Sequence, residues 1–175
     1  MKFYLLLLIF LTISACNNNA SEKSIEEIIV DSIETELPPV NNELANYELL
    51  FIGNSHTANN SLPELVKILI ETGQPDLSAN SVVAPGWQFL QERLTDNLTL
   101  KALTGHSWTH VILQGQKYSS SGLYTYSTEY AEEWVRRIKA QNATSIMFPE
   151  WPRHRNYEEG LRIHELHLEI DANEP

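Results

Sequence analysis

Polar residues follow three apolar segments of the sequence, and their types suit the attack of a hydroxyl group on a carbonyl carbon. Ser55 comes just after the apolar run that closes at Gly53. Gly86 closes a second such run, and Gln114 and Gln116 follow a third. A serine hydroxyl can act as nucleophile, while backbone N–H groups and a side-chain amide can hold the oxyanion that forms. The sequence therefore offers a nucleophile and oxyanion donors, provided that the fold brings them together.

The elements that must position these residues alternate regularly from residue 47 onward. Apolar runs bounded by turn residues predict strands at 47–53, 77–86, 107–115 and 144–152. Amphipathic segments predict helices at 61–73, 87–105, 127–143 and 157–172. Alternating strands and helices with short connections indicate an α/β fold, a three-layer α/β/α sandwich around a parallel sheet. In such sheets, polar residues at the carboxyl ends of the strands share one edge.

Two helix starts carry capping signals. Ser61 is followed by Glu64 at the spacing of a capping box. Ser127 or Thr128 is expected to cap the helix at 127–143.

Gly53-Asn54-Ser55 after the first strand resembles the first sequence block of the GDSL/SGNH hydrolases. Gly86 is similar to the glycine of the second block, and Gln114-Gly115-Gln116-Lys117 stands where the third block is usually Gly-x-Asn-Asp. Relatives that resemble sialate and xylan acetylesterases carry Gln-Gly-Glu there, which favours Gln114 as the amide donor, whereas the Gly-x-Asn spacing favours Gln116. We rank Gln114 first. The resemblance spans residues 47–152.

The resemblance implies a flavodoxin-like SGNH fold and hydrolysis of esters, with no cofactor. Ser55 would be the nucleophile, and the oxyanion hole would comprise the N–H groups of Ser55 and Gly86 with one Gln amide. Acetyl esters of carbohydrates are the implied substrates. The family's Asp-x-x-His block is absent, since no Asp in the sequence is followed three residues later by His. Either the chain is a fragment that lacks the last strand and helix, which we favour, or it is a protein without the catalytic base.

Several residues near the strand ends are candidates for substrate binding, namely Asn54, His56, Trp87, Trp151 and His154. The two tryptophans could stack on a sugar ring or simply cover the sheet edge. His56 is expected to line the site rather than to deprotonate Ser55, because side chains of adjacent residues diverge. No metal site is expected, since the remaining histidines lack the further ligands that a metal ion would need.

The N-terminus resembles a bacterial lipoprotein signal. Residues 1–15 combine a lysine, an apolar stretch and small residues, and Cys16 is the only cysteine of the chain. The ending "ISAC" resembles a lipobox, which implies lipidation of Cys16 and a place in the cell envelope. The alternative is a secreted soluble protein with a chance cysteine. Residues 16–46 are predicted to be an acidic, disordered tether, followed by the domain at 47–175.

The net charge limits the possible partners. A formal charge of -11 and a pI near 4.9, with no cluster of Lys and Arg, argue against binding to nucleic acid. The expected partners are a carbohydrate or small-molecule ester and, through the anchor, a membrane. Two other hypotheses remain open: a glycan-binding lipoprotein without catalysis, and a surface protein in which the Gly-Asn-Ser turn is structural.

Overall fold

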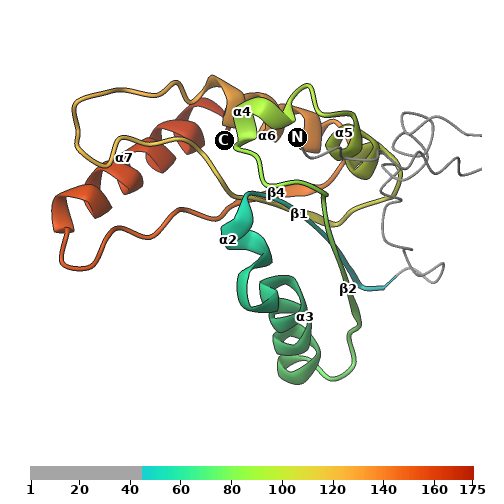
Figure 1. Cartoon of the computed structure of the whole chain (residues 1–175). Coiled ribbons are helices and arrows are strands. Elements are labelled where there is room, and N and C mark those ends of the chain that lie inside the picture. The colour runs from blue at the N-terminus through green and yellow to red at the C-terminus, as the bar shows by residue number, and fades with distance from the viewer. Residues whose placement is uncertain (1–44) are drawn as a thin grey trace, which may run out of the picture. The chain divides into compact units, whose positions relative to one another are not determined.

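The computed structural model describes residues 45–175 and contains one four-stranded sheet (Figure 1). The strands are β1 (Tyr47–Ile52), β2 (Ala79–Val83), β3 (His110–Leu113) and β4 (Thr144–Met147). All pairs are parallel, in the order β2-β1-β3-β4. The predicted parallel α/β fold is therefore confirmed. The predicted signal sequence, Cys16 and the predicted tether up to residue 44 lie outside the described residues.

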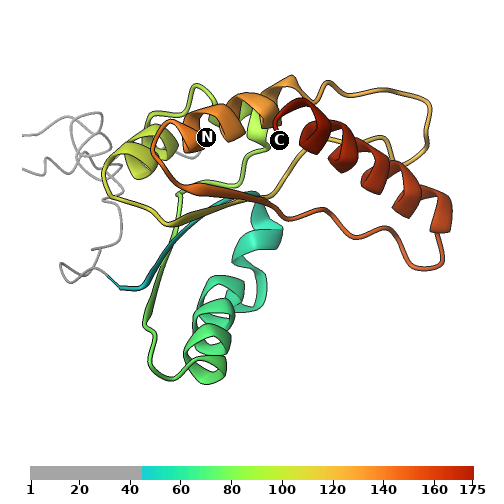
Figure 2. The ribbon, with the colours of Figure 1, turned by 180° about the vertical axis from the view of Figure 1, so that it is seen from behind.

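Helices cover both faces of this sheet, as the front and back views show (Figures 1 and 2). One face carries α2 (Ser55–Ala58), a 3-10 turn (Asn59–Ser61) and α3 (Leu62–Gly73). The other carries α4 (Leu90–Arg93), α5 (Asn97–Thr104), α6 (Glu129–Lys139) and α7 (Tyr157–Asn173). No helix of residues 45–175 has the length and apolar character needed to cross a bilayer.

The sheet has an apolar core on each face because successive strand side chains point to opposite sides. Leu50 and Ile52 of β1 face the larger core, which includes Trp134 of α6. Leu49 and Phe51 face the smaller core against α3. The central strands are buried on both faces, which is why Leu49–Ile52 of β1 and Val111–Leu113 of β3 are continuously apolar rather than alternating.

The segment 87–105, predicted as one helix, forms two helices, α4 and α5. The Asp96 carboxylate accepts a hydrogen bond from the backbone N–H of Thr99 and caps α5. An aspartate that offers its side chain to the backbone favours a helix start over a helix interior. The first helix ends at Arg93, whose side chain is fully buried on the same side of α4 as Leu90.

The capping box predicted at Ser61 is wrong. Ser61 has the left-handed φ of 54°, and its side chain makes no capping hydrogen bond. The chain enters α3 from the 3-10 turn rather than from an extended segment, and a capping serine requires extended backbone. At α6 the prediction is confirmed for Ser127, whose hydroxyl accepts a hydrogen bond from the N–H of Glu129 at 3.2 Å.

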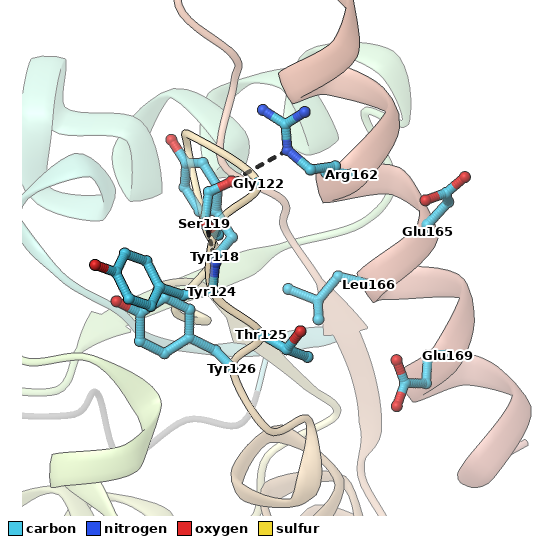
Figure 3. A pocket seen from close by; sticks show the side chains of 10 residues that line it. All are labelled: Tyr118, Ser119, Gly122, Tyr124, Thr125, Tyr126, Arg162, Glu165, Leu166 and Glu169. Carbon is cyan, nitrogen blue, oxygen red and sulfur yellow. Dashed lines mark hydrogen bonds between the residues drawn. The ribbon is translucent and has the colours of Figure 1, made fainter.

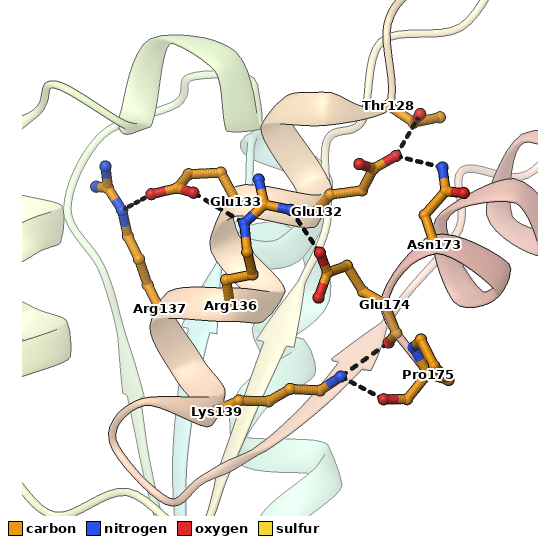
Figure 4. Close-up of polar contacts among 9 residues, drawn as sticks. All are labelled: Thr128, Glu132, Glu133, Arg136, Arg137, Lys139, Asn173, Glu174 and Pro175. Carbon is orange, nitrogen blue, oxygen red and sulfur yellow. Dashed lines mark hydrogen bonds and ion pairs between the residues drawn. The ribbon is translucent and has the colours of Figure 1, made fainter.

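Polar contacts join the end of α7 to α6 (Figure 4). Arg136 donates to Glu174 at 2.5 Å, and Asn173 donates to Glu132 at 2.8 Å. The hydrogen bonds from Asn173 and Thr128 lower the pKa of Glu132. Exposed pairs of this kind contribute little individually, and the fully buried Ile170 holds α7 in the larger core. These contacts therefore affect the orientation of α7 more than they contribute to the free energy of unfolding.

Candidate active site

Ser55 is the first residue of α2 and lies just beyond the carboxyl end of β1. Asn54 caps this helix, since its side-chain oxygen accepts a hydrogen bond from the N–H of His56 at 2.9 Å. Gly53 has to be glycine, because a Cβ there would lie 1.9 Å from Thr57 Oγ1. This tight passage from strand to helix brings the Ser55 hydroxyl to the sheet edge and leaves its N–H without an intrahelical acceptor.

A cavity of about 450 Å³ opens beside Ser55. Four of the predicted site residues line it: Ser55, His56, Trp87 and Trp151. The two indole side chains are 72% and 55% exposed. The imidazole of His56 lies against the ring of Trp151, with 4.8 Å between the ring centroids. The structure thus gathers a serine and two open aromatic surfaces that are far apart in the sequence.

Gly86 lies in the loop that follows β2, where its φ of +93° suits glycine. Its carbonyl oxygen accepts a hydrogen bond from the Arg93 side chain at 2.8 Å. Its N–H has no acceptor within residues 45–175. An unengaged backbone N–H is what the predicted role of Gly86 as an oxyanion donor requires.

The two glutamines predicted as alternative amide donors lie in different surroundings. Gln114 accepts hydrogen bonds from the N–H of Asn54 and the hydroxyl of Thr57, at 3.0 and 2.9 Å, and its amide donates to Glu150. Gln116 donates instead to the backbone oxygens of Lys117 and Ser127, at 3.1 and 3.0 Å. Gln114 is therefore buried beneath the turn that carries Ser55 and does not line the cavity, while Gln116 holds the following loop.

Glu150, which no motif of the sequence indicated, lies next to His56 of the cavity lining. One carboxylate oxygen accepts from Asn54 Nδ2 at 3.1 Å and from the Gln114 amide. The other lies 3.5 Å from Nδ1 of His56, and the Glu150 side chain is only 9% exposed. The sequence did offer one indication of Glu150, because this residue lies at the end of the fourth strand segment, at the sheet edge where the other candidate residues meet. Glu150 links Asn54, Gln114 and His56 into one network around Ser55.

Arg93 was also missed, because a lone arginine in an apparently amphipathic helix predicts an exposed residue. The structure buries its guanidinium beneath the loops that carry Ser55 and Gly86. Its spacing was a signal, because Arg93 comes three residues after Leu90 and therefore lies on the same helix face as that buried side chain.

His154 is exposed and does not line the cavity at Ser55. In the described part of the chain, no histidine makes a hydrogen bond to the Ser55 hydroxyl. No group of three or more His, Cys, Asp or Glu residues among residues 45–175 could hold a metal ion.

A second hollow of about 250 Å³ lies between the segment 118–126 and α7 (Figure 3). Arg162 of α7 donates to the carbonyl oxygen of Ser119 at 3.2 Å and ties the segment to the helix. The Tyr118 hydroxyl donates to Glu159, and burial together with this carboxylate raises the pKa of Tyr118. None of the predicted site residues lines this hollow. The hydrogen bonds around this hollow hold the loop after β3 in place.

Several solved structures are similar to this chain. A candidate SGNH hydrolase from Slackia heliotrinireducens matches with a TM-score of 0.60 and 21% identity, over 73% of this chain and 75% of that one. The psychrotrophic esterase EstA from Pseudoalteromonas sp., inhibited by monoethylphosphonate, matches with a TM-score of 0.50 and 14% identity, over 74% of both chains. TesA matches with a TM-score of 0.51 and 12% identity, over 73% of this chain and 74% of that one.

No family model matches the sequence, and no curated protein matches it. At identities below 25%, the similarity to the solved structures establishes the fold. The chain has the α/β fold of SGNH hydrolases and esterases, as its sequence blocks predicted.

Proposed function

We propose that this protein is a serine ester hydrolase of the SGNH type that removes acyl groups, acetyl above all, from carbohydrates at the cell surface. The observation that carries the proposal is the position of Ser55. It starts a helix at the carboxyl edge of a parallel sheet and shares a cavity with two exposed tryptophans. The similarity to EstA, a protein named as an esterase, supports the same reaction class.

In the proposed reaction, Ser55 Oγ attacks the carbonyl carbon of the ester while a base takes the hydroxyl proton. The carbonyl oxygen becomes an oxyanion, which the N–H groups of Ser55 and Gly86 and the remaining amide hydrogen of Gln114 stabilise. Collapse of this intermediate breaks the bond to the alcohol oxygen, which leaves with a proton. Water then attacks the acyl-Ser55 ester and releases the carboxylic acid.

The lining of the cavity supports a carbohydrate as the alcohol part of the substrate. Trp87 and Trp151 present exposed ring faces, on which the C–H groups of a sugar ring can pack. Asn59 and Asn60 line the same cavity and offer amides for sugar hydroxyl groups. A volume of about 450 Å³ is within the usual range for sites that hold small ligands.

The proposed place at the cell surface rests on Cys16 and the signal before it. We expect that Cys16 carries lipid and that Cys16→Ala releases the protein from membranes into the soluble fraction. Radiolabelled palmitate incorporation into the wild type and the variant tests this directly. Label that persists in Cys16→Ala would contradict the anchor.

A second candidate function is glycan binding without hydrolysis. It is favoured by one observation: His56 faces Glu150, and no histidine of residues 45–175 is hydrogen-bonded to Ser55. A serine without a base reacts slowly, whereas the two tryptophans would still hold a sugar. This candidate predicts binding of glycans by calorimetry and no release of acetate.

Replacement of Ser55 separates the two functions. If Ser55 is the nucleophile, Ser55→Ala lowers kcat on p-nitrophenyl acetate and on acetylated xylan on the order of 10³-fold or more. Ser120→Ala is the matched control, because Ser120 is exposed and lies outside the cavity. Equal hydrolysis by wild type and Ser55→Ala would exclude Ser55 as the nucleophile. Binding of xylan without release of acetate would favour glycan binding, the second candidate function.

A further inference from the structure

Arg93 is a fully buried cation beneath two loops of the candidate site. It ends α4, yet its guanidinium reaches the loop after β1, 40 residues earlier in the sequence. Arg93 Nε and Nη2 both donate to the carbonyl oxygen of Gly53, at 3.1 and 2.5 Å. One side chain therefore fixes the peptide that leads directly into Asn54 and Ser55.

The same guanidinium also holds the loop after β2. Nη2 donates to the carbonyl oxygen of Gly86 at 2.8 Å, and Nη1 donates to that of Pro85 at 2.9 Å. Arg93 thus joins the loop of the nucleophile to the loop of the proposed oxyanion donor. The planar fork of arginine suits this bridge, since it presents five donors in a fixed geometry.

The bond to Pro85 sets the direction of the Gly86 N–H. Residues 45–175 contain no cis peptide bond, and in a trans peptide the C=O and the N–H point in opposite directions. Because the Pro85 oxygen points at Arg93, the N–H of the same peptide, which belongs to Gly86, points away from Arg93. This N–H is the one without an acceptor in the described part of the chain.

We propose that Arg93 is a positioning residue that aims the Gly86 N–H at the oxyanion formed on Ser55. The inference rests on the proposed hydrolase function and deepens it, since it assigns the residue that sets the oxyanion hole. Arg93 itself does not touch the substrate. It acts through the Pro85–Gly86 peptide and through the carbonyl oxygen of Gly53.

The charge of Arg93 adds to this role. Its guanidinium makes no ion pair with a carboxylate of the described residues. Arg93 contacts Asp96 only indirectly, through Thr99. The Thr99 hydroxyl accepts a hydrogen bond from Arg93 Nη1 at 2.7 Å and donates one to the Asp96 carboxylate at 2.5 Å. Burial lowers the pKa of Arg93, but a guanidinium stays charged in proteins. A positive charge behind the two loops favours negative charge in the cavity.

The test compares Arg93→Lys with Arg136→Lys in steady-state hydrolysis of p-nitrophenyl acetate. Lysine keeps the charge, but its three donors sit on one nitrogen, whereas three nitrogens of Arg93 reach the carbonyl oxygens of Gly53, Ala84, Pro85 and Gly86. We expect kcat to fall on the order of 10²-fold in Arg93→Lys, with KM changed less than about threefold, because the oxyanion exists only after attack. Arg136 is exposed on α6, where it pairs with Glu133 and Glu174, and its variant should match the wild type.

A purely structural role predicts a different result. Arg93→Lys would then melt at a lower temperature but keep the wild-type kcat well below that temperature, which would overturn the proposal.

A crystal structure of the wild type with a phosphonate bound to Ser55 tests the proposal without any Arg93 variant. The Gly86 N–H should lie within hydrogen-bond distance of the phosphonate oxygen, while Arg93 still donates to Pro85. A Gly86 N–H turned away from that oxygen would overturn the inference. A protein that neither hydrolyses esters nor reacts with the phosphonate would contradict the proposed function itself, and the inference with it.

Discussion

Glu150 links three of the side chains around Ser55, namely Asn54, Gln114 and His56. Its carboxylate is nearly buried and satisfies amide donors that would otherwise lack partners. A buried donor left without an acceptor costs the free energy of its lost hydration. Glu150 therefore stabilises the arrangement of the site, whatever its effect on the chemistry.

This role predicts a difference between two substitutions of Glu150. Glu150→Ala leaves the amides of Asn54 and Gln114 unpaired and should lower the free energy of unfolding by about 1–3 kcal/mol. Glu150→Gln keeps an acceptor oxygen, so its free energy of unfolding should fall less than that of Glu150→Ala. Urea unfolding measures both, with Glu158→Ala, an exposed residue of α7, as the control. Equal losses in the Ala and Gln variants would show that the hydrogen bonds to Glu150 do not stabilise the site.

The positions of Ser55, Gly53 and Gly86 at the strand ends could be predicted from the sequence because these positions depend on local backbone. A strand that closes with Gly-Asn-Ser fixes where Ser55 goes. Glu150 and Arg93 act through residues that are 96 and 40 positions away. Periodicity within one segment cannot indicate such contacts, so both were missed.

At the scale of elements, the chain between α4 and α5 breaks after Arg93, and a second helix starts at Asp96. The Asp96 side chain caps α5 and also accepts a hydrogen bond from Thr99, which in turn contacts Arg93. One apolar stripe across 87–105 predicted a single helix and concealed this cap. Asp96 thus starts α5 and, through Thr99, helps to hold the buried Arg93 in place.

Loss of this cap should destabilise the protein measurably. Asp96→Ala removes the acceptor of the Thr99 N–H and should lower the free energy of unfolding by about 0.5–2 kcal/mol. Urea titration followed by circular dichroism measures the change. Asp76→Ala, in an exposed turn, is the control. A loss no larger than that of the control would mean that α5 does not depend on Asp96.

At the scale of the whole molecule, the parallel topology could be predicted because it depends on the order of strands and helices. Short connections between them leave few alternatives to a parallel sheet. The contacts that fix α7 were not predictable, since they join its two ends to separate segments. Glu159 accepts hydrogen bonds from Arg153 and Tyr118 at the start of α7, and Glu174 accepts one from Arg136 near its end.

The carboxylate of Glu159 should make the fold sensitive to acid. Hydrogen bonds from Arg153 lower the pKa of Glu159 below its ordinary value of 4.5. A carboxyl group with a lowered pKa in the folded state adds stability above its ordinary pKa, and this stability is lost as the pH falls through the lowered value.

Melting temperatures between pH 7 and pH 3 test this for the wild type and Glu159→Gln. The wild type should lose stability below about pH 4.5 more steeply than the variant, which has no charge to lose at this position. Parallel curves for the two proteins would show that Glu159 does not contribute to the dependence on pH.

The central claim is that Ser55 is the nucleophile of an ester hydrolase. The most direct measurement is peptide mapping by mass spectrometry after the protein reacts with a fluorophosphonate, which forms a stable bond with activated serines. If Ser55 is the nucleophile, one phosphonate group is found on Ser55, and in the same samples ester hydrolysis is lost in proportion to labelling. Labelling at another residue, or an unlabelled Ser55 in a protein that hydrolyses esters, would contradict this claim.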